Sequence, residues 1–468
     1  MVRDPESFPY AMTEPNSIPA ARYYDREFYE LECKRLWPRV WQMACRLEEI
    51  PRPGDFVEYE NVGQSIIVLR LDEDTVKAFY NTCPHRGMSL LEGRGSCRDG
   101  IVCSFHGWSW NLDGSNRSVY APDMFEASEL DAAFLALREC RVELWGGCAF
   151  ICMDDEAPAL RESLEPFASF HDARGVDKMR VQWWHSTVLP VNWKLAMEAF
   201  MESYHVMQTH PQMVTRSTAE GESARSETGL ASRKVGEISS RASYGGRPED
   251  VIAGSLHYLR TLSEGMSSMV LEKDIRVAEG LRDTKLPADP EQAYREWNLL
   301  LNDRITAWNR GAGIPVPDQN DLTERGLTSV VNYCFPHYFL LPMYGNAASY
   351  RIRPLGPEEC LFEIWGLTMY PEGEEPKERL STPVPMAPDD PRWPTIPGQD
   401  FSNLPRQQAG LRSNGFESMR LSREIEGMIL NYQRLIDGYL GRLGYEKLLP
   451  AVQKVSGPID DHMKDLGF

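Results

Sequence analysis

The sequence predicts an α+β protein in which a small all-β domain is followed by a larger domain that mixes helices with an antiparallel sheet. Short segments of β-branched and aromatic residues, interrupted by glycine and proline, dominate residues 41–155. Beyond residue 155, helical segments alternate with strand candidates that short turns connect. Strands grouped in one part of the chain, with helices and antiparallel strands in another, are typical of the α+β class.

The first 40 residues are predicted to form a helical arm. Phe28, Leu31 and Leu36 recur at helical spacing within a charged segment over 25–37. We expect this arm, residues 1–40, to pack with the larger domain.

The all-β domain is predicted over residues 41–155. Residues 65–71 and 75–80 are two apolar runs that an acidic turn joins, which indicates a hairpin. The run 148–153 is predicted to be a buried strand near the end of the domain. The acidic, proline-containing segment 154–158 then marks a boundary.

The larger domain is predicted over residues 156–468. Its helices are expected at 192–205, 290–308 and 422–441. Its strands are expected at 330–343, 347–354 and 360–370. Short connections between these strands predict an antiparallel meander, and the proline- and charge-rich segment 371–397 is expected to be a surface loop.

Composition excludes several classes of partner. Lys and Arg number 50 against 69 Asp and Glu, a formal net charge of −19 over 468 residues. This sign disfavours nucleic acid or an anionic membrane, because binding to phosphate relies on a basic surface. No run approaches about 18 apolar residues, and the N-terminus is polar and acidic where a signal peptide is basic and then apolar. We therefore expect a cytoplasmic protein whose ten scattered cysteines form no disulfide framework.

Two Cys-His pairs form the first chemical motif. Cys83 and His85 are followed, after seventeen residues, by Cys103 and His106, and each pair lies in a loop that contains glycine. Two thiolates and two imidazoles can hold either a zinc ion or a [2Fe–2S] cluster with Cys on one iron and His on the other. Zinc sites usually pair like residues, whereas each loop here supplies one Cys and one His, which suits the asymmetric cluster.

These loops and their sequence context resemble the Rieske motif of the ring-hydroxylating oxygenase α subunits. The resemblance also covers the order of the domains and extends to the C-terminal helix, with only about 213–325 outside it. It implies a Rieske [2Fe–2S] domain over 41–155 and a helix-grip catalytic domain with a twisted antiparallel sheet over 156–468. It also implies that Cys83, His85, Cys103 and His106 bind the cluster.

A second motif resembles the iron-binding segment of the same family. The segment 192–211 contains the pattern NWK…E…YH-x4-H-P, and the resemblance implies that His205 and His210 bind a mononuclear Fe(II). Two imidazoles and a carboxylate on one face leave open positions for O2 and substrate. Residues five apart diverge by ~140° on a regular helix. We therefore expect the helix to break or bulge between the two histidines, for example at a π-type turn.

Asp400 is predicted to be the carboxylate that completes the iron site. It precedes the sequence QQAGL, as an acidic residue precedes a similar run in the family. Asp389 and Asp390 are the alternatives, although both lie in the proline-rich segment. Asp400 could instead cap a helix, because Asp is favoured at that position.

Glu202 is predicted to support the iron site. The family places an acid three residues before the first iron histidine, where it bonds that histidine and the second Rieske histidine of a neighbouring subunit. Here the acid is Glu where Asp is common, a departure shared with some oxygenases of quaternary amines, and Ala199 stands where many members have Asn. Glu198, one turn earlier, could share the bridge or be an ordinary exposed glutamate.

The resemblance implies a terminal oxygenase that hydroxylates or dihydroxylates an aromatic or other hydrophobic ring with O2. O- or N-demethylation, or oxidation of a quaternary amine, is the alternative reaction. Electrons would come from a ferredoxin or flavin reductase, so that NAD(P)H acts only indirectly. A homotrimer is expected, and a small β subunit is compatible with it. Two other classes stay open: a pure electron-transfer Rieske protein and a zinc-stabilised helix-grip binding protein.

Overall fold

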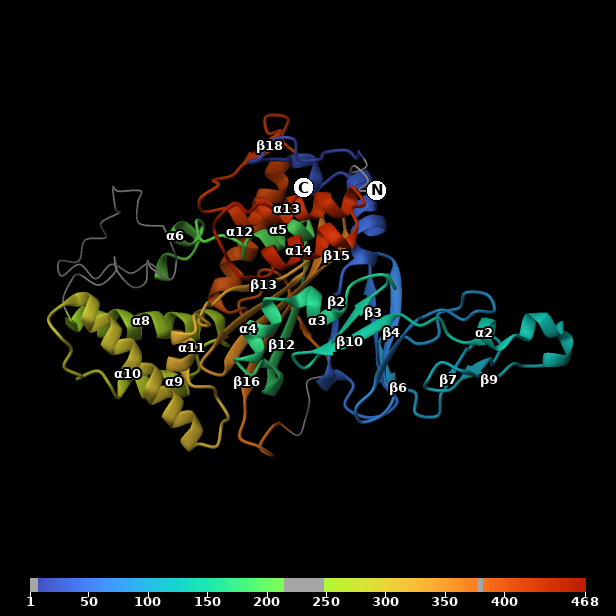
Figure 1. The fold of residues 1–468 in the computed structure, drawn as a ribbon, viewed down its shortest axis with the longest axis horizontal. Helices are drawn as coiled ribbons and strands as arrows, with labels where there is room; N and C mark the ends of the chain where they lie inside the picture. The colour runs from blue at the N-terminus through green and yellow to red at the C-terminus, as the bar shows by residue number, and fades with distance from the viewer. Residues whose placement is uncertain (1–6, 214–247, 377–381) are drawn as a thin grey trace.

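The computed structural model describes residues 7–213, 248–376 and 382–468 (Figure 1). Its N-terminal half begins with an all-β unit of three small antiparallel sheets. One sheet contains β5 (Val76–Tyr80), β4 (Gln64–Arg70), β3 (Asp55–Asn61) and β6 (Arg94–Ser96). The others contain β10 (Arg141–Trp145), β11 (Cys148–Cys152) and β2 (Gln42–Arg46), and β7 (Ile101–Val102), β8 (Ser109–Trp110) and β9 (Asn116–Ser118). The predicted hairpin is confirmed, because β4 and β5 pair antiparallel.

A seven-stranded sheet forms the centre of the second half, and the α+β class is confirmed. Its order is β17 (Val384–Pro385), β12 (Met179–Leu189), β16 (Glu359–Met369), β15 (Asn346–Gly356), β14 (Tyr338–Met343), β13 (Asn332–Cys334) and β19 (Gly457–Pro458). The strands are antiparallel except at β17, which pairs parallel to β12. The predicted strand 330–343 is two strands, because Pro336 has no N–H to donate between them.

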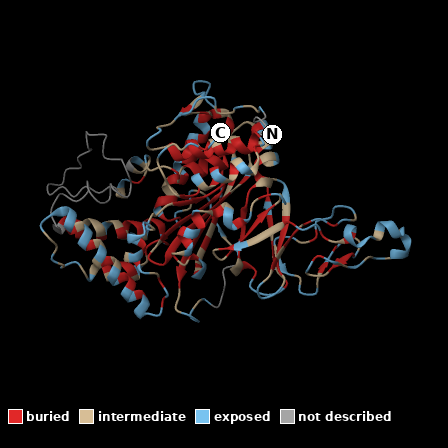
Figure 2. Ribbon diagram, viewed as in Figure 1, coloured by how far each residue is buried: buried red, intermediate tan, exposed pale blue. Residues whose placement is uncertain are grey.

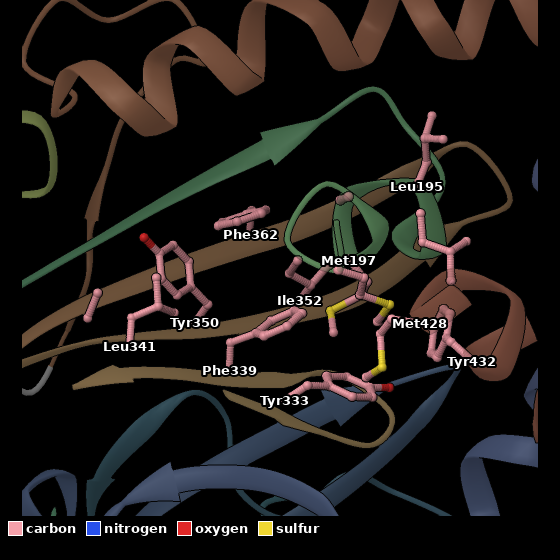
Figure 3. Close-up of a cluster of buried hydrophobic side chains, with 14 of the residues drawn as sticks. Leu195, Met197, Tyr333, Phe339, Leu341, Tyr350, Ile352, Phe362, Met428 and Tyr432 are labelled. Atoms are coloured by element: carbon pink, nitrogen blue, oxygen red, sulfur yellow. The ribbon is translucent and has the colours of Figure 1, made fainter. Parts of the chain in front are cut away.

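Each face of this sheet is buried against a different part of the chain (Figure 2). Side chains of a strand alternate between its two faces, so Phe339 and Leu341 join one core while Tyr338 and Leu340 join the other. The first core also contains residues of α5 and α13, and Figure 3 shows their side chains meeting those of the sheet. The second core includes residues of the all-β unit, such as Phe150.

Helices cover the sheet and extend beyond it. The larger ones are α8 (Pro248–Met266), α9 (Glu272–Glu279), α10 (Pro290–Gly311), α12 (Thr395–Leu411), α13 (Gly427–Leu440) and α14 (Tyr445–Val455), and the short helix α5 (Trp193–Glu198) precedes them in the chain. Shorter ones are α2 (Ala132–Leu135), α3 (Leu160–Leu164), α4 (Phe167–Asp172), α6 (Val206–Thr209) and α11 (Gln319–Glu324). Among the described residues, no helix is both long and apolar enough to cross a bilayer.

Three helix and loop expectations need correction. The predicted helix 192–205 stops at Glu198, after which the chain turns before α6. The predicted loop 371–397 contains β17 and the first turn of α12, while its residues 377–381 lie outside the described residues. The C-terminal helix is present as α13, but α14 follows it and was not predicted.

The N-terminal arm packs on α5 and α13 through buried charges. It consists of β1 (Ser17–Pro19), which pairs with β18 (Ser418–Arg420), and of α1 (Arg26–Leu31), which continues as a π-helical turn over Glu32–Leu36. The Nζ atom of Lys194 lies 2.7 Å from Oε1 of Glu32, and both side chains are fully buried. Arg22 of the arm pairs with Asp437 of α13 at 2.6 Å. An unpaired buried charge is costly, so these pairs hold the arm in one place.

Glu198 at the end of α5 belongs to the same buried network. The hydroxyl of Tyr23 donates to its carboxylate at 2.9 Å, and the amide of Gln433 also donates to it. Burial raises the pKa of Glu198 to about 7, although those hydrogen bonds and the charges of Lys194 and Arg22 oppose the shift. The carboxyl group therefore gains a proton on folding near neutral pH.

Replacing Glu198 by Gln should make the stability of the protein less dependent on pH. The pKa of Glu198 is higher in the folded than in the unfolded chain, so its favourable contribution is complete below about pH 4.5 and is lost as pH rises through about 7. Between pH 5 and 8 we expect the free energy of unfolding to fall more in the wild type than in Glu198→Gln, by up to about 3 kcal/mol. Urea unfolding at both pH values measures this difference. Glu264→Gln, at an exposed position of α8, is the matched control.

Candidate metal centres and cavity

The two Cys-His loops have the same backbone pattern. The N–H of Cys83 donates to the carbonyl of Met88, and the N–H of Gly87 donates back to the carbonyl of Cys83. In the second loop, Cys103 and Trp108 form the equivalent first bond, and the N–H of Gly107 donates to the carbonyl of Cys103. Both glycines have positive φ, 78° and 74°, which other residues rarely adopt. Each loop is therefore a tight turn closed on its own cysteine.

These loops bring their four predicted ligands together. The rings of His85 and His106 have centroids 4.6 Å apart, and the thiols of Cys83 and Cys103 lie within hydrogen-bond reach. Burial, with the nearby His106 and Arg86, lowers the pKa of His85, which favours the neutral ring that a metal needs.

The donor set fits a two-iron cluster better than a single zinc ion. The Nδ1 atom of His85 is buried and has no hydrogen-bond partner, as expected of an atom reserved for a metal. Cβ positions built at Gly87 and Gly107 would meet no atom within 4 Å, so space is open beside both loops. Tetrahedral zinc would bring its ligand atoms within about 4 Å of one another. Within the described residues, three or more such atoms gather within 4.8 Å only at a different place, the centre described next.

That second centre contains His205, His210 and Asp400. The Nε2 atoms of His205 and His210 lie 3.8 and 3.1 Å from Oδ1 of Asp400. Asp400 and His210 are buried, at 5% and 2% exposure, and the two imidazole rings are nearly perpendicular. Three donor atoms therefore converge on one point from segments about 190 residues apart.

The local fold explains how His205 and His210 reach this point. His205 caps the single turn of α6, and the helix ends at Thr209, so His210 leaves it with φ −120° and ψ 58°. The expected break between the histidines is present, but a π-type turn is not. The first interruption falls earlier, after Glu198.

Helix α12 places Asp400 and is bonded to both parts of the histidine segment. Asn403 donates to the hydroxyl of Thr209 at 3.2 Å, next to His210. At the other end of α12, Gln408 accepts from the N–H of Asn192, the residue that caps α5. Asp400 lies inside α12, whose N-cap is Pro394, so its side chain is not a cap.

The alternative carboxylates lie elsewhere. Asp389 is exposed, and Asp390 pairs with Arg392 at 2.6 Å. The hydrogen bond from Arg392 lowers the pKa of Asp390 to about 2. The carboxylate of Glu198 is hydrogen-bonded by Tyr23 and Gln433 and not by the histidines of this centre. Glu198 is buried, so it is not an ordinary exposed glutamate either.

Each imidazole is held from behind by a different partner. The Nδ1 atom of His205 lies 2.6 Å from Oε1 of Glu202, whose other oxygen accepts the backbone N–H of His205. The Nδ1 atom of His210 lies 2.7 Å from Oε1 of Gln399. Such partners fix which ring nitrogen carries the proton and leave Nε2 free for a metal. Sequence reasoning identified Glu202 but missed Gln399, although its position directly before Asp400 was the available signal.

Charges around His205 favour its protonated form in the absence of a metal. Burial lowers the pKa of His205, but the hydrogen bond and charge of Glu202, together with the charge of Asp400, outweigh burial and raise it. A divalent cation at this point would replace that proton and neutralise the same carboxylates.

A cavity of about 900 Å³ opens onto this centre. Its lining includes His205 and Asp400 and also six apolar or aromatic side chains, which are Phe200, Tyr258, Leu262, Met266, Met269 and Ile396. Four of these come from α8 and the turn after it, within the stretch 213–325 for which the sequence predicted no pocket residues. Charged side chains also line the cavity, and they are Lys454, Asp460, Asp461 and Lys464. Its volume is that of a site for a small molecule.

Two known families match the chain, and each matched segment contains one of the two centres. The family described as the Rieske [2Fe-2S] domain matches residues 40–129. The family described as the ring hydroxylating alpha subunit (catalytic domain) matches residues 176–441, more than half of the chain.

Individual relatives come from two kinds of oxygenase. The chain is 30% identical over 197 residues to the carnitine monooxygenase oxygenase subunit of Acinetobacter baumannii, covering 42% of this chain and 53% of that protein. It is 31% identical over 195 residues to the large oxygenase component of the naphthalene 1,2-dioxygenase system of Pseudomonas aeruginosa, covering 40% and 42%. The aligned region thus spans about half the length of these relatives.

Solved structures share the fold along nearly the whole chain. A naphthalene 1,2-dioxygenase with indole in its active site superimposes with a TM-score of 0.61 at 18% identity, covering 96% of this chain and 99% of that one. The apo form of a quaternary ammonium Rieske monooxygenase gives 0.58 at 18% identity, covering 93% and 99%.

Removing any of His205, His210 or Asp400 should affect one centre only. The Ala variants are expected to lose one iron per chain while the visible spectrum of the cluster persists, because the two donor sets lie in separate parts of the fold. Iron analysis with absorption spectroscopy measures both. Retention of the third iron by Asp400→Ala would mean that another acid completes the site.

Proposed function

Since the chain belongs to the ring-hydroxylating α-subunit family, we propose that it is a terminal oxygenase that uses O2 to hydroxylate or dihydroxylate a hydrophobic ring. The observation that carries this proposal is the convergence of His205, His210 and Asp400 on the lining of a cavity of about 900 Å³. A purely electron-carrying protein has no use for this second centre, and a zinc-binding protein has no use for the asymmetric Cys-His loops.

Each centre has a distinct role in the proposal. Cys83, His85, Cys103 and His106 hold the [2Fe–2S] cluster, and His205, His210 and Asp400 hold one Fe(II). The mononuclear iron, when bound, supplies the coordination positions at which O2 is activated. Glu202 orients His205, and the apolar wall with Phe200 and Tyr258 excludes water and presents the substrate to the open side of the centre.

Cavity chemistry favours a neutral hydrophobic substrate over a charged one. Much of the lining consists of aliphatic, aromatic and thioether groups, although the charged residues Lys454, Asp460, Asp461 and Lys464 also line the cavity. Methionines adapt their shape, so Met266 and Met269 suit a flat ring of variable outline. A quaternary amine is the second candidate, because carnitine monooxygenases are among the relatives and Glu202 stands where Asp is common.

Product analysis with a substrate panel tests the function. The protein, with its iron restored and a ferredoxin and reductase supplied, should consume NADH and O2 with polycyclic arenes, terpenoids or steroids and give hydroxylated products. Carnitine and other quaternary amines form the second arm. A protein that carries two irons per chain and oxidises nothing in either arm is an electron carrier, and a colourless zinc protein contradicts both readings.

The supply of electrons is part of the proposal. NAD(P)H acts indirectly, through a ferredoxin or flavin reductase that reduces the cluster. We place the cluster domain at residues 41–155, the catalytic domain at 156–468 and the arm at 1–40, in a cytoplasmic protein. A small β subunit is compatible with this arrangement.

Arrangement of the two centres favours electron transfer between subunits. The loops beside β6 and β7 lie toward one end of the molecule's long axis, and α6 lies toward the other (Figure 1). Within one chain the centres are thus far apart, so the cluster of one subunit should serve the iron of a neighbour in a trimer. His106 of one subunit and His205 of the next would be connected through Glu202.

Glu202→Gln should slow the transfer of electrons without removing either metal. The amide keeps the size of the side chain but weakens a charge-assisted hydrogen bond, which is roughly twice as strong as a neutral one. We expect both metals to stay bound and the cluster to be reduced normally, while reoxidation of the cluster by substrate and O2 falls at least tenfold. Single-turnover absorption spectroscopy measures this step.

Two results would contradict this route. Reoxidation of Glu202→Gln at the wild-type rate would remove Glu202 from it. A catalytically active monomer, measured by light scattering under assay conditions, would exclude transfer between subunits.

A further inference from the structure

Gln399 is not one of the three proposed metal ligands, but its side chain contacts one of them, His210. Gln399 precedes Asp400 on α12 and is half-buried. Its Oε1 atom lies 2.7 Å from Nδ1 of His210 and also accepts from Nε2 of Gln212 at 2.8 Å. Its own Nε2 lies 3.3 Å from Oε1 of Gln212, so the two amides form a reciprocal pair.

We propose that Gln399 is a positioning residue that holds His210 in the metal-binding orientation and tautomer; this inference rests on the proposed iron site. A neutral imidazole carries one proton, and the nitrogen that bears it cannot bind a metal. Because Oε1 of Gln399 only accepts, the proton of His210 stays on Nδ1. The lone pair of Nε2 then points toward Asp400, 3.1 Å away.

The reciprocal pair explains why Gln399 presents oxygen to the ring and not its NH2 group. Gln212 donates to the same Oε1 atom and accepts from Nε2, so turning the amide of Gln399 over without also turning that of Gln212 would break both contacts. A flipped amide would also place a donor against Nδ1 and move the proton of His210 to Nε2. Gln212 therefore secures the acceptor that His210 needs.

The two iron histidines consequently have partners of different charge. Glu202 is a carboxylate behind His205, whereas Gln399 is a neutral amide behind His210. Asp400 and Glu202 already give the centre two negative charges. A carboxylate in place of Gln399 would add a third. The amide supplies the acceptor without that charge.

Gln399 also connects the centre to the wall of the cavity. The backbone carbonyl of Gln212 lies 3.1 Å from Nε2 of His257 on α8, and Tyr258 beside it lines the cavity. Met213, which follows Gln212, lines the cavity as well. The amide pair thus joins α12 to a segment that contacts α8, and the position of His210 depends on both.

Co(II) binding to protein depleted of mononuclear iron, with its cluster retained, tests the proposal. Gln399→Leu removes the acceptor, and loss of such a partner typically weakens metal binding by about 10- to 100-fold. We expect that loss in competition with a chelator, together with altered visible bands of bound Co(II). Gln399→Glu restores an acceptor and should bind Co(II) at least as tightly as the wild type. Gln407→Leu, exposed on the same helix, is the matched control and should behave as wild type.

Each outcome separates this inference from the proposed iron site. Wild-type affinity and spectrum in Gln399→Leu would overturn the inference, as would failure of Gln399→Glu to restore binding while its cluster spectrum and circular dichroism stay native. If the wild type binds no Co(II), or if its Co(II) binding persists in His210→Ala, the proposed iron site is wrong. Weakened binding in Gln399→Leu, rescued by Gln399→Glu, supports both.

Discussion

The structure depends on one constraint, which is that two imidazoles and a carboxylate must meet within a few ångströms although they come from segments about 190 residues apart. Helix α12 meets this constraint by bonding the histidine segment at three levels. Gln408 contacts the cap of α5, Asn403 contacts Thr209, and Gln399 contacts His210. Asp400 is placed between the last two, so its position is determined by the same helix that orients His210.

Buried charges provide the rigid base for this arrangement. Lys194 and Glu32 form a fully buried pair, and Glu198 is bound by Tyr23 and Gln433. These contacts hold α5 between the N-terminal arm and α13 and determine where the chain leaves it toward His205. The N-terminal arm thus supports the segments that carry the centre. Removing one partner of these buried polar groups would leave the other unpaired, which is costly, so the contacts favour one arrangement of the arm.

The cavity lies beside the centre that these contacts support. Tyr258, Leu262 and Met266 of α8 line it, and Nε2 of His257 on the same helix lies 3.1 Å from the backbone carbonyl of Gln212, in the segment that follows His210. Substrate contacts and metal contacts therefore share supports, and a change in one affects the other. The separation of the two centres within one chain is the reason for proposing that a neighbouring subunit supplies the electrons (Figure 1).

The sequence by itself determined the α+β class and the hairpin of β4 and β5, and it supplied the residues proposed for both centres. Local patterns were sufficient for these, because Cys-His spacing, strand alternation and the context of His205 and His210 are properties of neighbouring residues. Only the tertiary structure decided that Glu198 is buried in a network with Tyr23, that Gln399 supports His210, and that α8 forms the cavity wall. Those features depend on contacts between segments about 45 to 235 residues apart, and no short-range pattern records which of many similar side chains will meet.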